Sequence, residues 1–147
     1  MSQSSPDTDT LETAVAELSL ATTQLVRRVR AESDAQELGW SQLAIVARLD
    51  TGGPMTTADL ARAEAMQPQS MGANLAMLER AGLVERRPHP TDKRQVLFAL
   101  TAEGVEARRR RSLAKRAWLL AAMAEFNPAE QQTLIAASAL IRRLADS

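Results

Sequence analysis

Apolar positions in residues 10–31 recur at alternating steps of four and three, with polar positions between them. The stripe consists of Leu11, Val15, Leu18, Thr22, Leu25 and Val29. This spacing is typical of one face of an amphipathic helix of about six turns. Because the stripe is as narrow as the seam of a coiled coil, we expect a partner helix to cover it.

The remaining pattern predicts a mainly α fold with a small β-hairpin. Helices are expected over 41–50, 57–65, 68–81, 102–126 and from 128 to near the C-terminus, the last with Leu134, Ala137, Ile141 and Leu144 as its apolar stripe. The predicted N-caps are Ser41, Thr57, Thr101 and Asn127.

The helix expected over 68–81 begins with Pro68 at its first position, where a missing N–H costs nothing. Met71, Leu75 and Leu78 are spaced to form its buried face, and Gly82 supplies a left-handed stop.

Residues 83–100 predict two short apolar strands joined by a turn that carries Lys93 and Arg94. A helix followed by a basic hairpin is the layout of a winged helix-turn-helix. That layout places one helix in a DNA major groove and the hairpin tip beside it.

The charge distribution supports this interpretation, although the net charge is zero. Residues 1–79 hold 5 Lys/Arg against 11 Asp/Glu, whereas residues 80–116 hold 11 against 4. A localised basic segment is the expected footprint of phosphate contacts. The Arg108–Arg111 run has an equally good alternative explanation as the solvated face of a helix.

Several classes of function find no support. The chain has no Cys, which excludes disulfides, thiol catalysis and thiol redox sensing. His89 is the single His, so a His-based metal site is not expected, and we expect no cofactor. There is no paired-carboxylate motif and no Gly-rich phosphate loop, so we predict no enzyme activity. No stretch suggests a membrane helix, and residues 1–9 are expected to be a disordered lead-in to a cytoplasmic protein.

Several motifs together resemble the MarR (multiple antibiotic resistance regulator) family of bacterial transcription factors. The motifs are Leu60-Ala61, Pro68, Leu78-Glu79-Arg80-Ala81-Gly82-Leu83-Val84-Glu85-Arg86-Arg87-Pro88, Asp92-Lys93-Arg94 and Leu100-Thr101-Ala102-Glu103-Gly104. The resemblance runs in register from Gly39 to the C-terminus, and the first predicted helix fits as well.

The resemblance implies a homodimer that binds double-stranded DNA. Residues 10–36 and 102–147 would form a helical dimerisation region, and residues 38–101 a winged helix-turn-helix domain. Such dimers bind pseudo-palindromic operators, usually as repressors, and many release DNA when a small, often aromatic, anion binds. The alternative is a winged-helix interaction module that keeps the dimer fold without specific DNA binding.

The predicted recognition helix offers few groups that read bases. Its candidate contact residues are Gln67, Gln69, Ser70, Ala73, Asn74 and Met77. Gln69 and Asn74 are able to contact adenine in a bidentate manner. Relatives often carry Arg or Thr where this chain has Gly72, Ala73, Ala76 and Met77. Either Ala73 and Met77 touch thymine methyl groups, or specificity depends on DNA shape.

The candidate wing residues are Arg86, Arg87, Asp92, Lys93 and Arg94. Arg94 resembles the family arginine that enters the minor groove, and Asp92 is close enough in sequence to brace it; alternatively, the pair only closes the turn. Lys93 is expected to contact phosphate. Of Arg86 and Arg87, one is expected to pair internally and the other to face phosphate, with no indication which.

Two aromatic residues complete the predictions. Trp40 lies where the family's effector pocket tends to be, but a plain core position is the favoured interpretation. His89, between Pro88 and Pro90, is expected to be a solvent-exposed loop residue.

Overall fold

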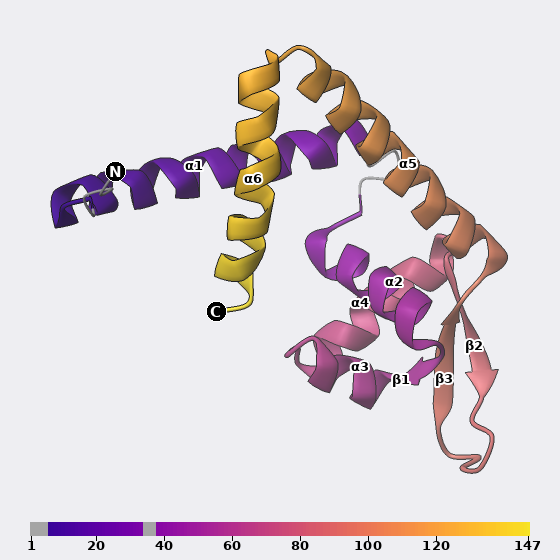
Figure 1. The fold of residues 1–147 in the computed structure, drawn as a ribbon. Helices are drawn as coiled ribbons and strands as arrows, with labels where there is room; N and C mark the ends of the chain where they lie inside the picture. Colours follow the sequence, from indigo (N-terminus) through magenta and orange to yellow (C-terminus); the bar gives the residue numbers. More distant parts are fainter. Residues whose placement is uncertain (1–5, 34–37) are drawn as a thin grey trace. The chain divides into compact units, whose positions relative to one another are not determined.

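The computed structural model describes residues 6–33 and 38–147, in which the predicted helices and the predicted hairpin are present, together with a short additional strand (Figure 1). The elements are α1 Thr8–Ser33, α2 Trp40–Gly52, β1 Met55–Thr56, α3 Thr57–Ala63, α4 Pro68–Arg80, β2 Val84–Pro88, β3 Val96–Leu100, α5 Ala102–Ala124 and α6 Pro128–Ala145. The chain separates into two units: residues 34–113, called here the winged unit, and residues 1–33 with 114–147, the helical unit. The boundary at 113 falls within α5.

The core of the winged unit is built from α2, α3 and α4, with contributions from Leu83 just before β2, from the starts of β2 and α5, and from Phe98 of β3. Its fully buried large side chains are Ile45, Leu60, Met71, Leu75, Leu78 and Leu83. Burying each such side chain stabilises the fold by about 1.5–3 kcal/mol. The predicted inward face of α4 is thereby confirmed, and it fixes which residues of α4 point away from the core.

The strands form a three-stranded antiparallel sheet in the order β1-β3-β2. Val84 lies opposite Leu100 and Pro88 opposite Val96, which confirms the predicted hairpin. The short β1 adds a third strand by pairing Met55 with Phe98. Pro88 ends the edge strand β2, where its missing N–H breaks no ladder.

The end of α4, the hairpin of β2 and β3 (called here the wing) and the start of α5 meet at one closely packed junction. Gly82 has φ +76°, and the Leu83 N–H donates to the Leu78 carbonyl oxygen at 3.0 Å, which confirms the predicted left-handed stop. The Thr101 hydroxyl donates to the Gly82 carbonyl oxygen at 2.6 Å and accepts from the Gly104 N–H at 3.0 Å. The start of α5 is therefore held directly against the end of α4.

Two of the four predicted N-caps are confirmed and two are wrong. Thr101 caps α5, and Asn127 caps α6 in a reciprocal box with Glu130. The α3 cap is Thr56, not Thr57, because the Thr56 hydroxyl accepts the Asp59 N–H at 3.1 Å.

The α2 helix also begins one residue earlier than predicted, so its N-cap is Gly39 and not Ser41. Glycine has no side chain to accept an N–H of the first turn, but the Gly39 N–H itself donates to the Gln42 side-chain oxygen at 3.1 Å, which satisfies the backbone donor of the capping residue.

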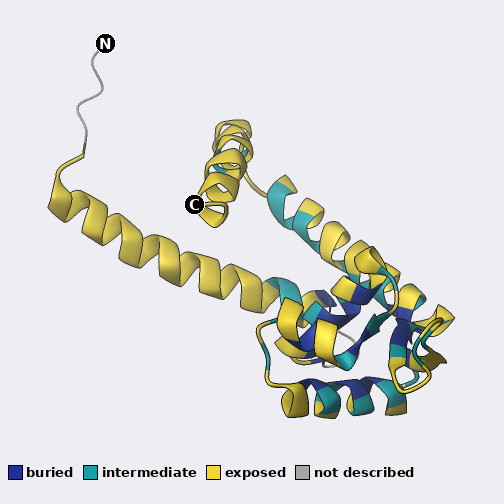
Figure 2. Ribbon diagram, turned by 90° about the horizontal axis from the view of Figure 1, so that it is seen from below, coloured by how far each residue is buried: buried dark blue, intermediate teal, exposed yellow. Residues whose placement is uncertain are grey.

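In the helical unit, α1 and α6 bury almost none of their apolar side chains within the chain (Figure 2). Ser33 is the one buried residue among the described positions of α1, and α6 has none. The exposed apolar side chains of the two helices include Leu11, Val15, Leu18, Leu25, Leu134, Ile141 and Leu144. Both predicted stripes are present on their helices, and their large apolar side chains stay exposed among the residues that the structure describes.

Candidate nucleic-acid interface

The outward face of α4 consists of small or polar residues, as the sequence predicts. Gln67, Gln69, Ser70, Ala73 and Met77 are exposed, and Asn74 is half-buried. The buried positions Met71, Leu75 and Leu78 hold the opposite side of the helix in the core.

Two of these side chains are engaged within the protein. The Asn74 amide nitrogen donates to the Ser70 carbonyl oxygen at 2.9 Å, one turn earlier in the helix. The Met77 sulfur accepts from the Gln42 side-chain amide at 3.4 Å. The exposed Gln69 amide has no hydrogen-bond partner among the described residues, so both its donor and its acceptor are available.

The wing tip presents two cations to solvent. The Arg94 side chain is 90% exposed, and its Nε lies 3.3 Å from Asp92 Oδ1. The same carboxylate oxygen accepts the Arg94 backbone N–H at 3.0 Å. The predicted bracing of Arg94 by Asp92 is therefore present in the structure. Lys93 is exposed and forms no ion pair within the described part of the chain.

Asp92 is held in its charged form. Its pKa lies below 3.8, mainly because its carboxylate accepts the Arg94 backbone N–H, and further because the Gln95 and Arg94 side chains donate to it. The Gln95 amide nitrogen lies 3.0 Å from Asp92 Oδ2. Gln95 is not among the predicted wing residues, although its position three residues after Asp92 could have indicated this hydrogen bond.

Arg86 and Arg87 both form ion pairs within the protein, so the expected internal pairing is present for each of them, and contact of either one with phosphate stays a prediction. Arg86 Nε lies 3.0 Å from a Glu79 oxygen of α4, and the guanidinium stacks 5.3 Å from the centre of the Phe98 ring. Arg87 Nη2 lies 2.8 Å from Glu85 Oε1 on the same strand. Because residues 86 and 87 point to opposite sides of β2, each meets a different carboxylate.

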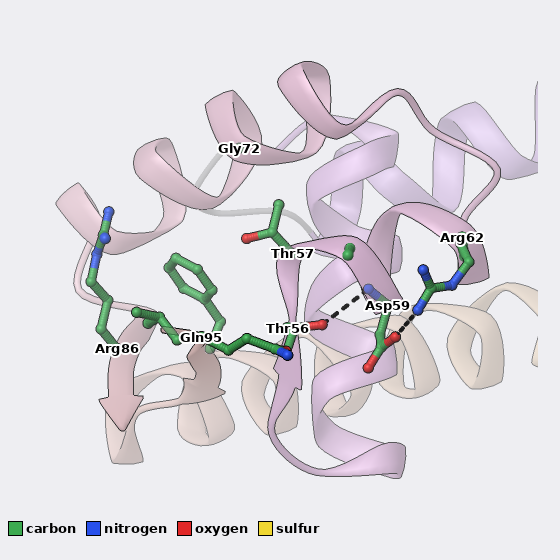
Figure 3. A pocket seen from close by; sticks show the side chains of 10 residues that line it. Thr56, Thr57, Asp59, Arg62, Gly72, Arg86 and Gln95 are labelled. Carbon is green, nitrogen blue, oxygen red and sulfur yellow. Dashed lines mark hydrogen bonds and ion pairs between the residues drawn. The ribbon is translucent and has the colours of Figure 1, made fainter. Parts of the chain in front are cut away.

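An open hollow separates α4 from the wing and the start of α3 (Figure 3). The side chains and backbone that line it include Thr57, Asp59, Arg62, Gly72, Arg86 and Gln95. Gly72 leaves its edge open, since a Cβ at this position would meet no atom within 4 Å.

Trp40 is 60% exposed, so the favoured interpretation of a core residue is wrong. It is the first residue of α2, and this early position leaves the indole outside the packed face of the helix. His89 lies in the loop as expected, but it is half-buried and its Nδ1 accepts hydrogen bonds, so the expectation of full solvent exposure is wrong.

Within residues 6–33 and 38–147, no cluster of three or more His, Cys, Asp and Glu side chains is placed to hold a metal ion. None of the helices in these ranges is both long and apolar enough to cross a bilayer.

A helix packed on one face, followed by an antiparallel hairpin with an exposed cationic tip, defines the winged helix-turn-helix class. The sequence profile of the MarR family matches residues 38–96. An uncharacterized HTH-type transcriptional regulator of Mycobacterium bovis is 35% identical over 130 residues, which cover 88% of this chain and 91% of that protein. The chain therefore belongs to the MarR family of transcriptional regulators.

Solved structures agree with this assignment. A transcriptional regulator from Pseudomonas aeruginosa is 33% identical, with a TM-score of 0.83 over 97% of this chain and 99% of that one. The protein RV1404 from Mycobacterium tuberculosis is 27% identical, with a TM-score of 0.80 over 97% of each chain.

Proposed function

We propose that this regulator binds a pseudo-palindromic operator as a homodimer and represses transcription from it, without enzymatic activity. The observation that carries the proposal is the exposed Arg94, braced by Asp92 at the tip of a wing that follows α4. A guanidinium on a projecting hairpin suits the narrow, negatively charged minor groove of A·T-rich DNA.

Base reading falls chiefly to Gln69. It is exposed and without a partner among the described residues, whereas the Asn74 amide would first have to leave the Ser70 carbonyl. Ala73 and Met77 offer only apolar contact with thymine methyl groups. We therefore expect a few direct contacts supplemented by recognition of DNA shape.

The homodimer is supported by the uncovered stripes of α1 and α6. Large apolar side chains repeated along one face of a helix are stable in water only when another surface covers them. A second copy of the chain supplies the same stripes, and a two-fold dimer would match a two-fold operator.

The dimer proposal has an internal control on α1. Leu18 lies on the stripe, whereas Leu20 lies on the opposite side of the helix, and both are exposed. Leu18→Asp should shift the protein toward monomer in sedimentation equilibrium, and Leu20→Asp should not. Equal effects of the two substitutions would argue against the stripe as the interface.

We further propose that a small aromatic anion releases the protein from DNA, with the exposed Trp40 near its site. Phenolic anions should quench the fluorescence of a Trp118→Phe variant, in which Trp40 is the remaining tryptophan. Absence of quenching across several phenolic acids would remove Trp40 from this role.

The deciding experiment compares the DNA upstream of the chain's own gene with scrambled DNA of equal length, over a range of salt concentrations. Sequence-dependent binding with a steep salt slope would support the proposal. Weak binding that is indifferent to sequence would favour the interaction module instead.

A further inference from the structure

The wing tip is a seven-residue loop, residues 89–95, between β2 and β3. Loops of this length lose considerable conformational entropy when one conformation is selected. Most of its residues are exposed, but His89 and Asp92 are half-buried. These two side chains are therefore the ones placed to fix the shape of the loop.

His89 holds the backbone of the tip through one ring nitrogen. Its Nδ1 accepts the Thr91 N–H at 3.2 Å and the Asp92 N–H at 3.0 Å, with the Thr91 hydroxyl 3.4 Å away. A ring nitrogen that accepts N–H groups does so with its lone pair, so this geometry uses Nδ1 as the acceptor and leaves Nε2 as the N–H donor. The interaction satisfies two backbone donors that the hairpin ladder does not reach.

The flanking prolines limit the freedom of this histidine. Pro88 fixes its own φ, and Pro90 restricts the preceding residue to extended conformations. Less entropy is therefore lost when the imidazole closes onto the turn.

The contacts of His89 lead directly to Arg94. The hydrogen bond from the Asp92 N–H to His89 fixes the backbone from which the Asp92 side chain projects. The Asp92 carboxylate in turn accepts from both the Arg94 backbone N–H and the Arg94 Nε. The order of contacts is thus imidazole, backbone of residue 92, carboxylate, guanidinium. None of them buries Arg94, so the guanidinium is aimed while it remains free to meet DNA.

We propose that His89 is a positioning residue of the wing, which presents Arg94 to the minor groove by holding the backbone that carries Asp92. This inference rests on the proposed DNA-binding function. His89 itself is not required to touch DNA, and its effect on binding passes through Arg94.

The test measures the affinity of the full-length protein for an A-tract duplex and for a G·C-rich duplex of equal length. Asn places an acceptor oxygen at the position of Nδ1, so His89→Asn should bind within about twofold of wild type. His89→Ala, which removes the acceptor, should weaken A-tract binding by about fivefold, and Arg94→Ala by about tenfold.

A double-mutant cycle separates positioning from a merely structural role. In the Arg94→Ala background, His89→Ala should cause no further loss of A-tract binding. A loss of equal size in both backgrounds would overturn the proposal, as would wild-type affinity for His89→Ala.

Amide hydrogen exchange at Thr91 and Asp92 provides a readout independent of DNA. Exchange should accelerate in His89→Ala and stay slow in His89→Asn. If exchange were unchanged in both variants, the imidazole would not hold the turn, and the inference would be refuted. If the turn responds as expected but wild type and Arg94→Ala bind DNA equally, the assigned role of Arg94 fails, and the positioning role fails with it.

Discussion

Two helical glycines of the winged unit, Gly72 and Gly104, should respond in opposite ways to replacement by alanine. A Cβ at Gly72 would meet no atom within 4 Å, whereas a Cβ at Gly104 would lie 2.1 Å from the Leu83 carbonyl oxygen. The two substitutions add the same methyl group to a helix, so their difference reports the local packing alone.

The magnitudes follow from this geometry. Alanine is better than glycine in a helix by about 1 kcal/mol, so Gly72→Ala should raise the free energy of unfolding by about that amount. At Gly104 the start of α5 must move by about 1 Å, and overpacking of this kind costs about 1–3 kcal/mol.

The same movement would break two hydrogen bonds at the junction. These join the Thr101 hydroxyl to the Gly82 oxygen and the Thr101 N–H to the Leu83 oxygen. Each contributes about 1 kcal/mol. After the helix-propensity gain is subtracted, Gly104→Ala should lower the free energy of unfolding by about 2–4 kcal/mol.

Urea unfolding followed by circular dichroism, at one fixed protein concentration, measures both variants against wild type. The urea concentration at the midpoint of unfolding should rise for Gly72→Ala and fall for Gly104→Ala. If Gly104→Ala were as stable as Gly72→Ala, the close contact between α5 and the Leu83 carbonyl would be wrong.

Three further predictions concern the DNA-facing residues. Gln69→Ala should weaken specific operator binding by roughly 1–3 kcal/mol, and Asn74→Ala by less; equal losses would contradict the assignment of base reading to Gln69. Arg94→Ala should reduce the slope of log affinity against log salt by about one, so an unchanged slope would remove Arg94 from the DNA contacts. The pKa of Asp92 in the folded protein should lie below its ordinary value of 3.8, chiefly because its carboxylate accepts the Arg94 backbone N–H. The charged carboxylate therefore stabilises the wing at pH values above the pKa of the unfolded chain. This stabilisation is lost as the pH falls through the pKa of the folded protein. A pH titration followed by the NMR signal of the Asp92 carboxyl carbon would contradict this prediction if its midpoint lay at or above pH 3.8.

Signals confined to a few neighbouring residues predicted the structure well. Gly82, Thr101 and Asn127 each act through contacts within about one helical turn, or across the adjacent junction, and all three have the predicted roles. Where two candidates of similar chemistry are adjacent, the sequence could not choose between them, and it named Thr57 where Thr56 is the cap.

Features that depend on tertiary geometry were missed. The pairing of Arg86 with Glu79 requires the placement of β2 against α4, and the exposure of Trp40 requires the start of α2 at that residue. The role of His89 depends on the path of the loop, which no residue pattern specifies. The fold and the local contact between Asp92 and Arg94 could therefore be predicted from the sequence, but the contacts of His89 that hold the loop could not.

The carboxylates paired with the wing arginines have a consequence for the search along genomic DNA. Arg86, Arg87 and Arg94 each hold an acidic partner, so an arbitrary phosphate must compete with a carboxylate that stays nearby and repels it. In the proposed DNA-binding role, encounters with wrong sequences would then gain little from these arginines, and the protein would dissociate from them quickly. Against the millions of competing sites in a genome, weak attachment elsewhere raises occupancy of the operator as effectively as tighter binding to it.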